Sequence, residues 1–152
     1  MNMQYRLERY LIHSVAVINN DDYDAKKPSH TGDSEVSIGI AEKKNDSTRR
    51  MVTLEIHVKP TKGREDCFFP YRIAIKGSAF FRFRTEYSKS ETDHFLRLNG
   101  ASILYGLLRG QVAQITAQGT HGQFLLPIFN FVEAEKKAGK AVAGKRTKTA
   151  KK

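Results

Sequence analysis

The sequence predicts an α+β fold, in which a four-stranded antiparallel sheet is followed by a long helix and a short C-terminal helix. Apolar and polar residues alternate in four segments between residues 5 and 83, and this is the period of a β-strand. Turn-forming residues separate these segments without any helical pattern, as in an antiparallel meander. After residue 100 the apolar residues recur at spacings of three and four, which predicts a helix.

The first expected strand, Tyr5–Asn19, carries apolar residues at both of its alternating sets of positions. The sets are Leu7, Leu11, Val15 and Val17, and Tyr10, Ile12, Ala16 and Ile18. Its β-branched residues and the polar run that follows favour a strand over a helix. Because successive side chains of a strand point to opposite faces, both faces are expected to be covered or to meet a partner.

Three further strands follow a long polar connection. That connection, residues 20–34, has Tyr23 as its only aromatic residue, and its length is typical of functional or disordered segments. The strands are Glu35–Ala41, Met51–Lys59 and Phe69–Phe83. Turns are expected at Asn45–Ser47 and Pro60–Asp66. Gly77 is expected to interrupt the last strand with a bulge or a bend.

The long helix is predicted from one apolar stripe. The stripe consists of Ile103, Leu104, Leu107, Leu108, Val112 and Ile115. Ser90–Asp93 offers N-cap side chains upstream, and Gly119 stands where a helix-ending glycine is common. An extended apolar stretch, residues 122–131, leads to a short helix from Glu133 to about Lys140. The chain thus reads as one domain, residues 1–138, with a disordered Lys-rich tail, residues 139–152.

The positive charge of the chain is concentrated in this tail. Of the net charge of +10, residues 133–152 carry +6, so the body is only mildly basic. Together with Phe80–Arg84, where Phe and Arg are interleaved, the tail suggests an alternative function as a nucleic-acid-binding module. The small charge of the body makes nucleic acid the less favoured partner.

The sequence contains no recognisable catalytic or metal-binding constellation. Cys67 is the only cysteine, so neither an intrachain disulfide nor a Cys-rich metal site is possible. The five histidines are scattered, and there is no phosphate-binding glycine loop or nucleophile elbow. No run reaches ~18 apolar residues, so no membrane-spanning helix is expected. We therefore expect a cytoplasmic protein that is not an enzyme and needs neither cofactor nor metal.

The second half of the chain resembles the SecB protein-export chaperones. The resemblance rests on Asn99–Arg109, then Ile115–Thr120, then Leu126–Phe131. These segments match the family's Ile-Leu-aromatic helix start, an Arg about five residues on, a Gly-rich turn and an apolar-Pro stretch that ends in Asn-Phe. The order of strands and helices also matches over about residues 5–138.

The resemblance implies a fold, an assembly and an activity. The fold would be a twisted four-stranded antiparallel sheet with two helices. The assembly would be a homotetramer, a dimer of dimers with the long helices between the sheets. The activity would be ATP-independent holding of unfolded polypeptides in grooves between the sheet, the first loop and the second helix.

The chain departs from the family at the positions that serve the translocation motor. Family members carry carboxylates on the sheet that dock the SecA motor, whereas the aligned positions here are Ser14, Ile18 and Ala74. Docking of a SecA-type motor is therefore not expected. This departure favours a divergent member that protects a dedicated client, such as the antitoxin of a toxin–antitoxin pair, over one that serves general protein export.

Two sets of residues are predicted to act by apolar contact. The client-binding set is Val15, Val17, Tyr23, Val36, Ile38, Phe124, Leu125, Phe129 and Phe131. The set for helix packing or oligomer contact is Ile73, Ile75, Ile103, Leu104, Leu107, Leu108, Val112 and Ile115.

Overall fold

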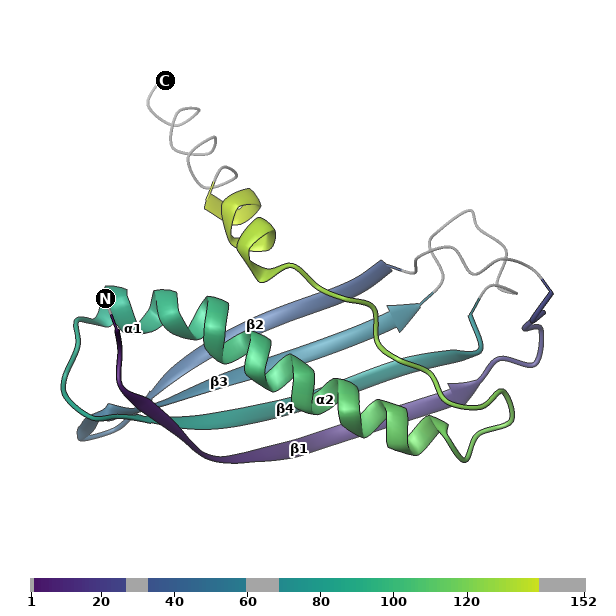
Figure 1. Ribbon diagram of the computed structural model, residues 1–152, viewed down its shortest axis with the longest axis horizontal. Helices are drawn as coiled ribbons and strands as arrows, with labels where there is room; N and C mark the ends of the chain where they lie inside the picture. Colours follow the sequence, from purple (N-terminus) through teal and green to yellow (C-terminus); the bar gives the residue numbers. More distant parts are fainter. Residues whose placement is uncertain (1, 27–32, 60–68, 140–152) are drawn as a thin grey trace, which may run out of the picture.

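The computed structural model describes residues 2–26, 33–59 and 69–139, and it confirms the predicted α+β fold. Figure 1 shows one sheet with the helices and the segment that follows them on a single face. The strands are β1 (Tyr5–Asn19), β2 (Asp33–Lys43), β3 (Asp46–Lys59) and β4 (Tyr71–Phe83). All neighbouring strands are antiparallel. The predicted turn Pro60–Asp66 and the tail from residue 140 onward lie outside the described residues.

The strand order is β1-β4-β3-β2, so the predicted meander is correct only for β2, β3 and β4. The prediction is wrong for β1, which pairs with β4 and lies at the opposite edge from β2. The physical reason is burial: the alternating apolar residues of β3 and β4, such as Leu54 and Ile75, are the most completely buried. These two strands therefore occupy the centre, and β1 and β2 form the edges.

Two β-bulges explain why the apolar residues of β1 alternate irregularly. The pairing with β4 shifts between Leu7 and Arg9 and again between Ile12 and Ser14. Each extra residue reverses which side chains face the helices. As a result residues of both sets share the helix-side face, which carries Tyr5, Leu7, Tyr10, Ile12, Val15 and Val17 opposite odd-numbered residues of β4. Leu11, Ala16 and Ile18 lie on the other face. The strand therefore carries apolar residues on both faces, as expected, but more of them on the helix-side face than the alternation predicts.

Gly77 does not interrupt β4, contrary to the expected bulge or bend. The strand is continuous, and Gly77 pairs with Ile12 on one side and Leu54 on the other. A Cβ atom at this position would lie 2.8 Å from Leu108 Cδ2 and 2.9 Å from the Leu11 carbonyl oxygen. A glycine is needed here because the long helix lies directly against the strand.

The helical part starts at Ser88 and continues to Thr116. It comprises α1 (Lys89–Phe95), a π-helical stretch η2 (Leu96–Gly100) and α2 (Ala101–Thr116). Ser88 and Glu91 form a capping box, in which the Glu91 N–H donates to Ser88 Oγ over 3.2 Å. The cap therefore lies two residues before the predicted Ser90–Asp93. None of the helices among the described residues is long and apolar enough to span a membrane.

The predicted apolar stripe packs the helix on the sheet. Leu104, Leu108 and Val112 are fully buried, and so are Ile73 and Ile75 beneath them. Ile103 and Leu107 are half-buried, whereas Ile115 is 40% exposed. The stripe is therefore wider than one sheet can cover, and its margin points outward.

Gly119 has a different role from the predicted helix-ending one. The positive φ value in this turn, +78°, belongs to Gly122. At Gly119 a Cβ atom would lie 2.5 Å from the Tyr71 hydroxyl oxygen. That hydroxyl accepts from the His121 N–H over 2.9 Å and donates to the Gly122 carbonyl over 2.9 Å. Gly119 thus leaves room for a tyrosine that holds the turn on the sheet.

Candidate functional site

The candidate site is a groove of about 600 Å³ between β2, η2 and a C-terminal helix, residues 131–139. The apolar side chains of Val36 and Ile38 form its strand wall. Phe131 and the small residues Ala134 and Ala138 form its helix wall. The other lining residues are Arg97, Glu135 and Gly139. The groove is therefore mostly apolar, with charged residues at its rim.

Polar contacts fix the C-terminal helix in place. The Asn130 side-chain oxygen accepts from the Glu133 N–H over 3.1 Å, which caps the helix start. The Glu135 carboxylate lies 3.3 Å from His94 Nδ1 of α1. The Phe131 ring packs on Phe129, with centroids 4.7 Å apart. The helix is thus attached at its first turns, while its apolar face remains open toward β2.

The segment before this helix, residues 122–130, is attached to α2. The Tyr105 hydroxyl donates to the Pro127 carbonyl, and Arg109 Nε donates to the Leu126 carbonyl over 2.9 Å. Burial raises the pKa of Tyr105, so its hydroxyl stays protonated and remains a donor at neutral pH. The Phe124 N–H donates to Thr116 Oγ1 over 2.8 Å. These hydrogen bonds hold the extended segment in a fixed position along α2.

Apolar surface continues from the groove along this segment. A second hollow of about 160 Å³ lies between α2 and the segment, with Phe129 and Phe131 in its wall. Ile128 is 90% exposed and Val132 is 49% exposed. Neither residue belongs to the client-binding set predicted from the sequence. The uninterrupted apolar run 124–129 could have predicted exposed apolar side chains here, because a single buried face cannot accommodate six consecutive apolar side chains.

The structure brings together only part of the predicted client-binding set. Val36, Ile38 and Phe131 line the groove, and Phe129 lines the second hollow. Leu125 is 53% exposed on the connecting segment, and Phe124 is half-buried against the core. These residues follow one path from the turn after α2 to the edge of β2.

Val15, Val17 and Tyr23 lie elsewhere. The two valines are on β1, at the sheet edge opposite β2, so a single groove of one chain cannot contain both pairs. The Tyr23 ring packs edge-on against His121, with centroids 4.9 Å apart, and His121 Nε2 lies 2.9 Å from the Asn20 carbonyl oxygen. Tyr23 therefore secures the connection after β1 to the turn after α2.

The features suggested for nucleic-acid binding are not assembled into a site. Phe81 and Phe83 are 0% and 2% exposed, so neither can stack on a base. Phe80 and Arg82 of that motif face away from the helices, as their pairing with Met51 and Arg49 indicates. The Lys-rich tail lies outside the described residues, apart from Gly139.

The positions aligned with the family's acidic patch all lie on the face of the sheet without helices. Ala16 pairs with Ala74 and Ser14 with Lys76, which places these positions on that face, as does Ile18 opposite Arg72. No cluster of His, Cys, Asp and Glu among the described residues could hold a metal ion.

Comparison with solved structures identifies the fold. The chain is similar to the Mycobacterium tuberculosis SecB-like chaperone Rv1957, solved in complex with a ChAD peptide from the Rv1956 HigA1 antitoxin. The TM-score is 0.64 at 14% sequence identity, and the match covers 83% of this chain and 91% of that chain. The chain therefore has the SecB-like fold that its sequence predicts.

A second solved structure, a protein of unknown function from Streptococcus agalactiae, is similar with a TM-score of 0.48 and 12% identity. That match covers 85% of this chain and 100% of the other. No protein-family model and no curated protein matches the chain.

Proposed function

We propose that this protein is an ATP-independent holding chaperone of SecB type, which binds unfolded polypeptides in the groove between β2 and the helix at residues 131–139. The observation that carries the proposal is the open apolar groove, whose strand wall lies on an edge of the sheet. A strand edge offers unpaired N–H and C=O groups, and the groove offers apolar area. Together they suit sequence-tolerant binding of extended chains. The chaperone domain would comprise residues 1–138.

Within this function we propose a dedicated client, such as an antitoxin, in preference to general protein export. The SecB-like chaperone Rv1957 was solved with an antitoxin peptide, which supports this branch. The open sheet face has Ser14, Ile18 and Ala74 in place of the acidic patch, which argues against docking of a SecA-type motor. Both observations favour a chaperone outside the export route.

The central test is suppression of aggregation without nucleotide. The full chain should slow the aggregation of a chemically unfolded model protein, measured by light scattering, in buffer without ATP. A homotetramer with several grooves would bind one extended client at several weak sites, which adds affinity through effective concentration. Unchanged aggregation at several-fold molar excess of the protein would contradict the proposal.

We also propose that the chain assembles through β1. This edge strand has no second neighbour among the described strands, and Tyr5, Leu7 and Val15 are 41%, 37% and 42% exposed on its helix-side face. Pairing of two such edges would satisfy backbone groups and bury apolar area at once. The exposed margin of α2 at Ile115 would then help to join two dimers.

Val15→Asp is therefore expected to lower the solution mass. The unmodified protein should have about four times the chain mass of 17.2 kDa, measured by light scattering after gel filtration. The variant should have the mass of a monomer, because a buried unpaired carboxylate is strongly unfavourable at an interface. Ser37→Asp, on the opposite edge strand, is the matched control and should leave the mass unchanged. A monomeric unmodified protein would refute the assembly.

A further inference from the structure

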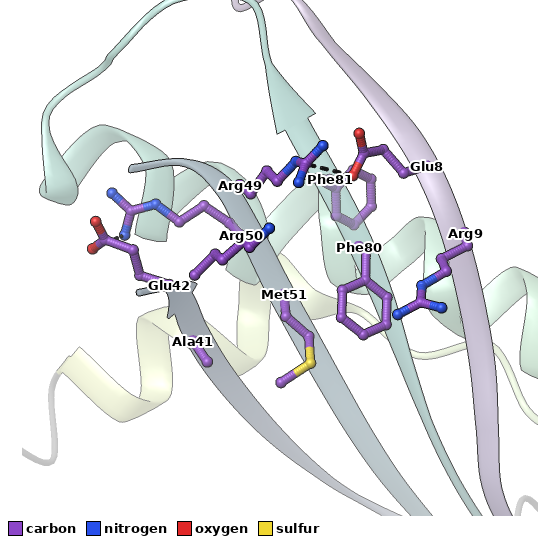
Figure 2. A pocket seen from close by; sticks show the side chains of 10 residues that line it. Glu8, Arg9, Ala41, Glu42, Arg49, Arg50, Met51, Phe80 and Phe81 are labelled. Carbon is purple, nitrogen blue, oxygen red and sulfur yellow. Dashed lines mark ion pairs between the residues drawn. The ribbon is translucent and has the colours of Figure 1, made fainter. Parts of the chain in front are cut away.

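The face of the sheet opposite the groove carries a cavity of about 460 Å³ near the β2–β3 hairpin. Figure 2 shows Met51 and Phe80 in its floor, with Arg9 and Arg49 beside them. In the described part of the chain the helices and the connecting segment lie on the other face (Figure 1). The cavity is thus independent of the groove, and it combines an apolar floor with charged walls.

Positive charge exceeds negative charge around this cavity. Five cations surround it or adjoin it, and two carboxylates lie among them. The cations are Arg6, Arg9, Lys43, Arg49 and Arg82, and the carboxylates are Glu8 and Asp46. The neighbouring pair Arg50 and Glu42 is neutral, joined over 2.9 Å. The local excess of positive charge is therefore large, because the part of the chain before the Lys-rich tail is only mildly basic overall.

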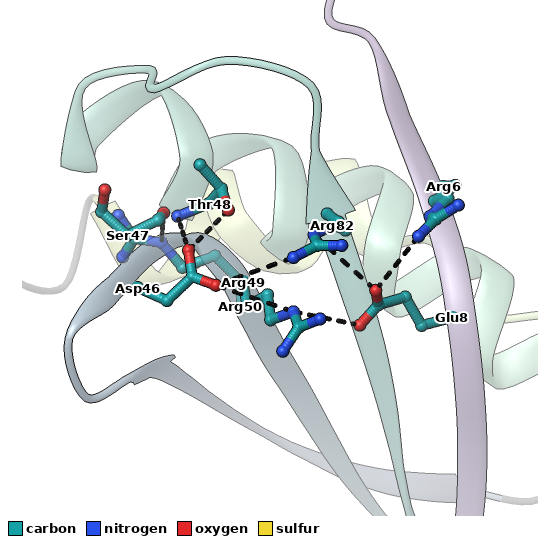
Figure 3. A network of polar contacts seen from close by, with 8 residues as sticks. All are labelled: Arg6, Glu8, Asp46, Ser47, Thr48, Arg49, Arg50 and Arg82. Carbon is teal, nitrogen blue, oxygen red and sulfur yellow. Dashed lines mark hydrogen bonds and ion pairs between the residues drawn. The ribbon is translucent and has the colours of Figure 1, made fainter.

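The two carboxylates do not satisfy the arginines that share them. The carboxylate oxygens of Glu8 lie 3.6 Å from a guanidinium nitrogen of Arg6, 3.6 Å from one of Arg49 and 3.8 Å from one of Arg82. Asp46 lies 3.6 Å from Arg49 and 4.0 Å from Arg82. All five distances are longer than a charge-assisted hydrogen bond, which spans about 2.7–2.9 Å. Figure 3 shows these long contacts spread across three strands, so the guanidinium groups retain donors for another acceptor.

The remaining cations face the cavity without a carboxylate partner. The Arg9 guanidinium lies over the Phe80 ring, 4.7 Å from its centroid. Neither Arg9 nor Lys43 forms an ion pair among the described residues. Hydrogen bonds from the Thr48 hydroxyl and the Thr48 N–H, followed by the charges of Arg49 and Arg82, keep the pKa of Asp46 below its ordinary value. The carboxylate of Asp46 is therefore ionised, and Arg9 and Lys43 can bind a further carboxylate.

We propose that this cavity binds an acidic peptide segment in which carboxylates flank one apolar side chain. The apolar side chain would rest on Met51 and Phe80, and the carboxylates would reach Arg9, Arg49 and Lys43. Nucleic acid fits less well, because the closely spaced charges of a continuous phosphate backbone would meet Glu8 and Asp46. A peptide can instead place its few carboxylates at Arg9 and Lys43, away from these two groups. The occupant is therefore an acidic protein partner, bound apart from the client groove.

The test uses the full chain and a short fluorescein-labelled peptide of Asp and Glu around one Phe, followed by fluorescence anisotropy. The double variant Arg9→Gln and Lys43→Gln should bind about tenfold or more weakly, since it removes two charge-assisted contacts. The matched double variant Lys136→Gln and Lys137→Gln, on the C-terminal helix, should bind as the unmodified protein does. Replacing the peptide's Phe with Ser should also weaken binding.

Two results would overturn the proposal. One is equal affinity of the Arg9/Lys43 variant and the unmodified protein, which would assign the binding to the Lys-rich tail or to no site. The other is tighter binding of a uridine oligonucleotide of equal charge that depends on Arg9, which would make the cavity a nucleic-acid site. A groove variant, Val36→Ser with Ile38→Ser, should leave peptide binding intact, so the chaperone proposal and this one can fail separately.

Discussion

Replacing Val36 and Ile38 together with serine is expected to weaken client binding about 30-fold, which corresponds to about 2 kcal/mol. Both side chains are half-buried and form the strand wall of the groove. A bound client would cover their remaining apolar surface, and serine would leave little of that gain. The change should appear as a higher dissociation constant for an unfolded reporter chain and as weaker suppression of aggregation.

The matched control is Leu11→Ser with Ile18→Ser. These residues are 39% and 60% exposed on the open face of β1, so the control removes more exposed apolar surface than the groove variant does, at a site away from the groove. Client binding by this variant should equal that of the unmodified protein. If both double variants lost affinity equally, binding would depend on general surface hydrophobicity, and the groove would not be the client site.

The contrast between Val36 and Val15 shows which part of the site could be predicted from sequence. Alternation in β2 correctly placed Val36 and Ile38 on one apolar face, because that strand has a regular register. The same reasoning grouped Val15 and Val17 with them, although β1 lies at the other edge. Strand order depends on which strands can bury most surface at the centre of the sheet, and local alternation does not report it.

The two bulges of β1 illustrate a second limit of prediction from sequence. A bulge changes the face of every later side chain, and its position depends on the partner strand. The sequence showed two interleaved apolar sets, and only the pairing with β4 reveals that members of both, such as Leu7 and Tyr10, share one face. The helix stripe was easier to predict, since its spacing depends on residues within one helix. The charged cavity on the open face was missed because its residues come from all four strands.

Gly77→Ala is expected to lower the free energy of unfolding by about 2 kcal/mol, within the range for overpacked cores. The added Cβ would lie 2.8 Å from Leu108 Cδ2 and 2.9 Å from the Leu11 carbonyl oxygen. Leu108 can rotate only at the expense of its packing, because it is fully buried. The Leu11 carbonyl belongs to the paired backbone of β1 and has less freedom. The strand must therefore move away from its neighbour or from the helix.

Gly39→Ala is the matched control, since it makes the same change in another strand of the same sheet. The nearest atom to its added Cβ would be Thr53 Cβ at 3.9 Å, an ordinary contact. Alanine restricts the unfolded chain more than glycine, so this variant should be more stable by about 0.5–1 kcal/mol. Urea unfolding at a fixed protein concentration measures both changes, because stability of an oligomer depends on concentration. If both variants shifted in the same direction, backbone entropy would decide the outcome, and close contact between α2 and β4 would not explain the glycine.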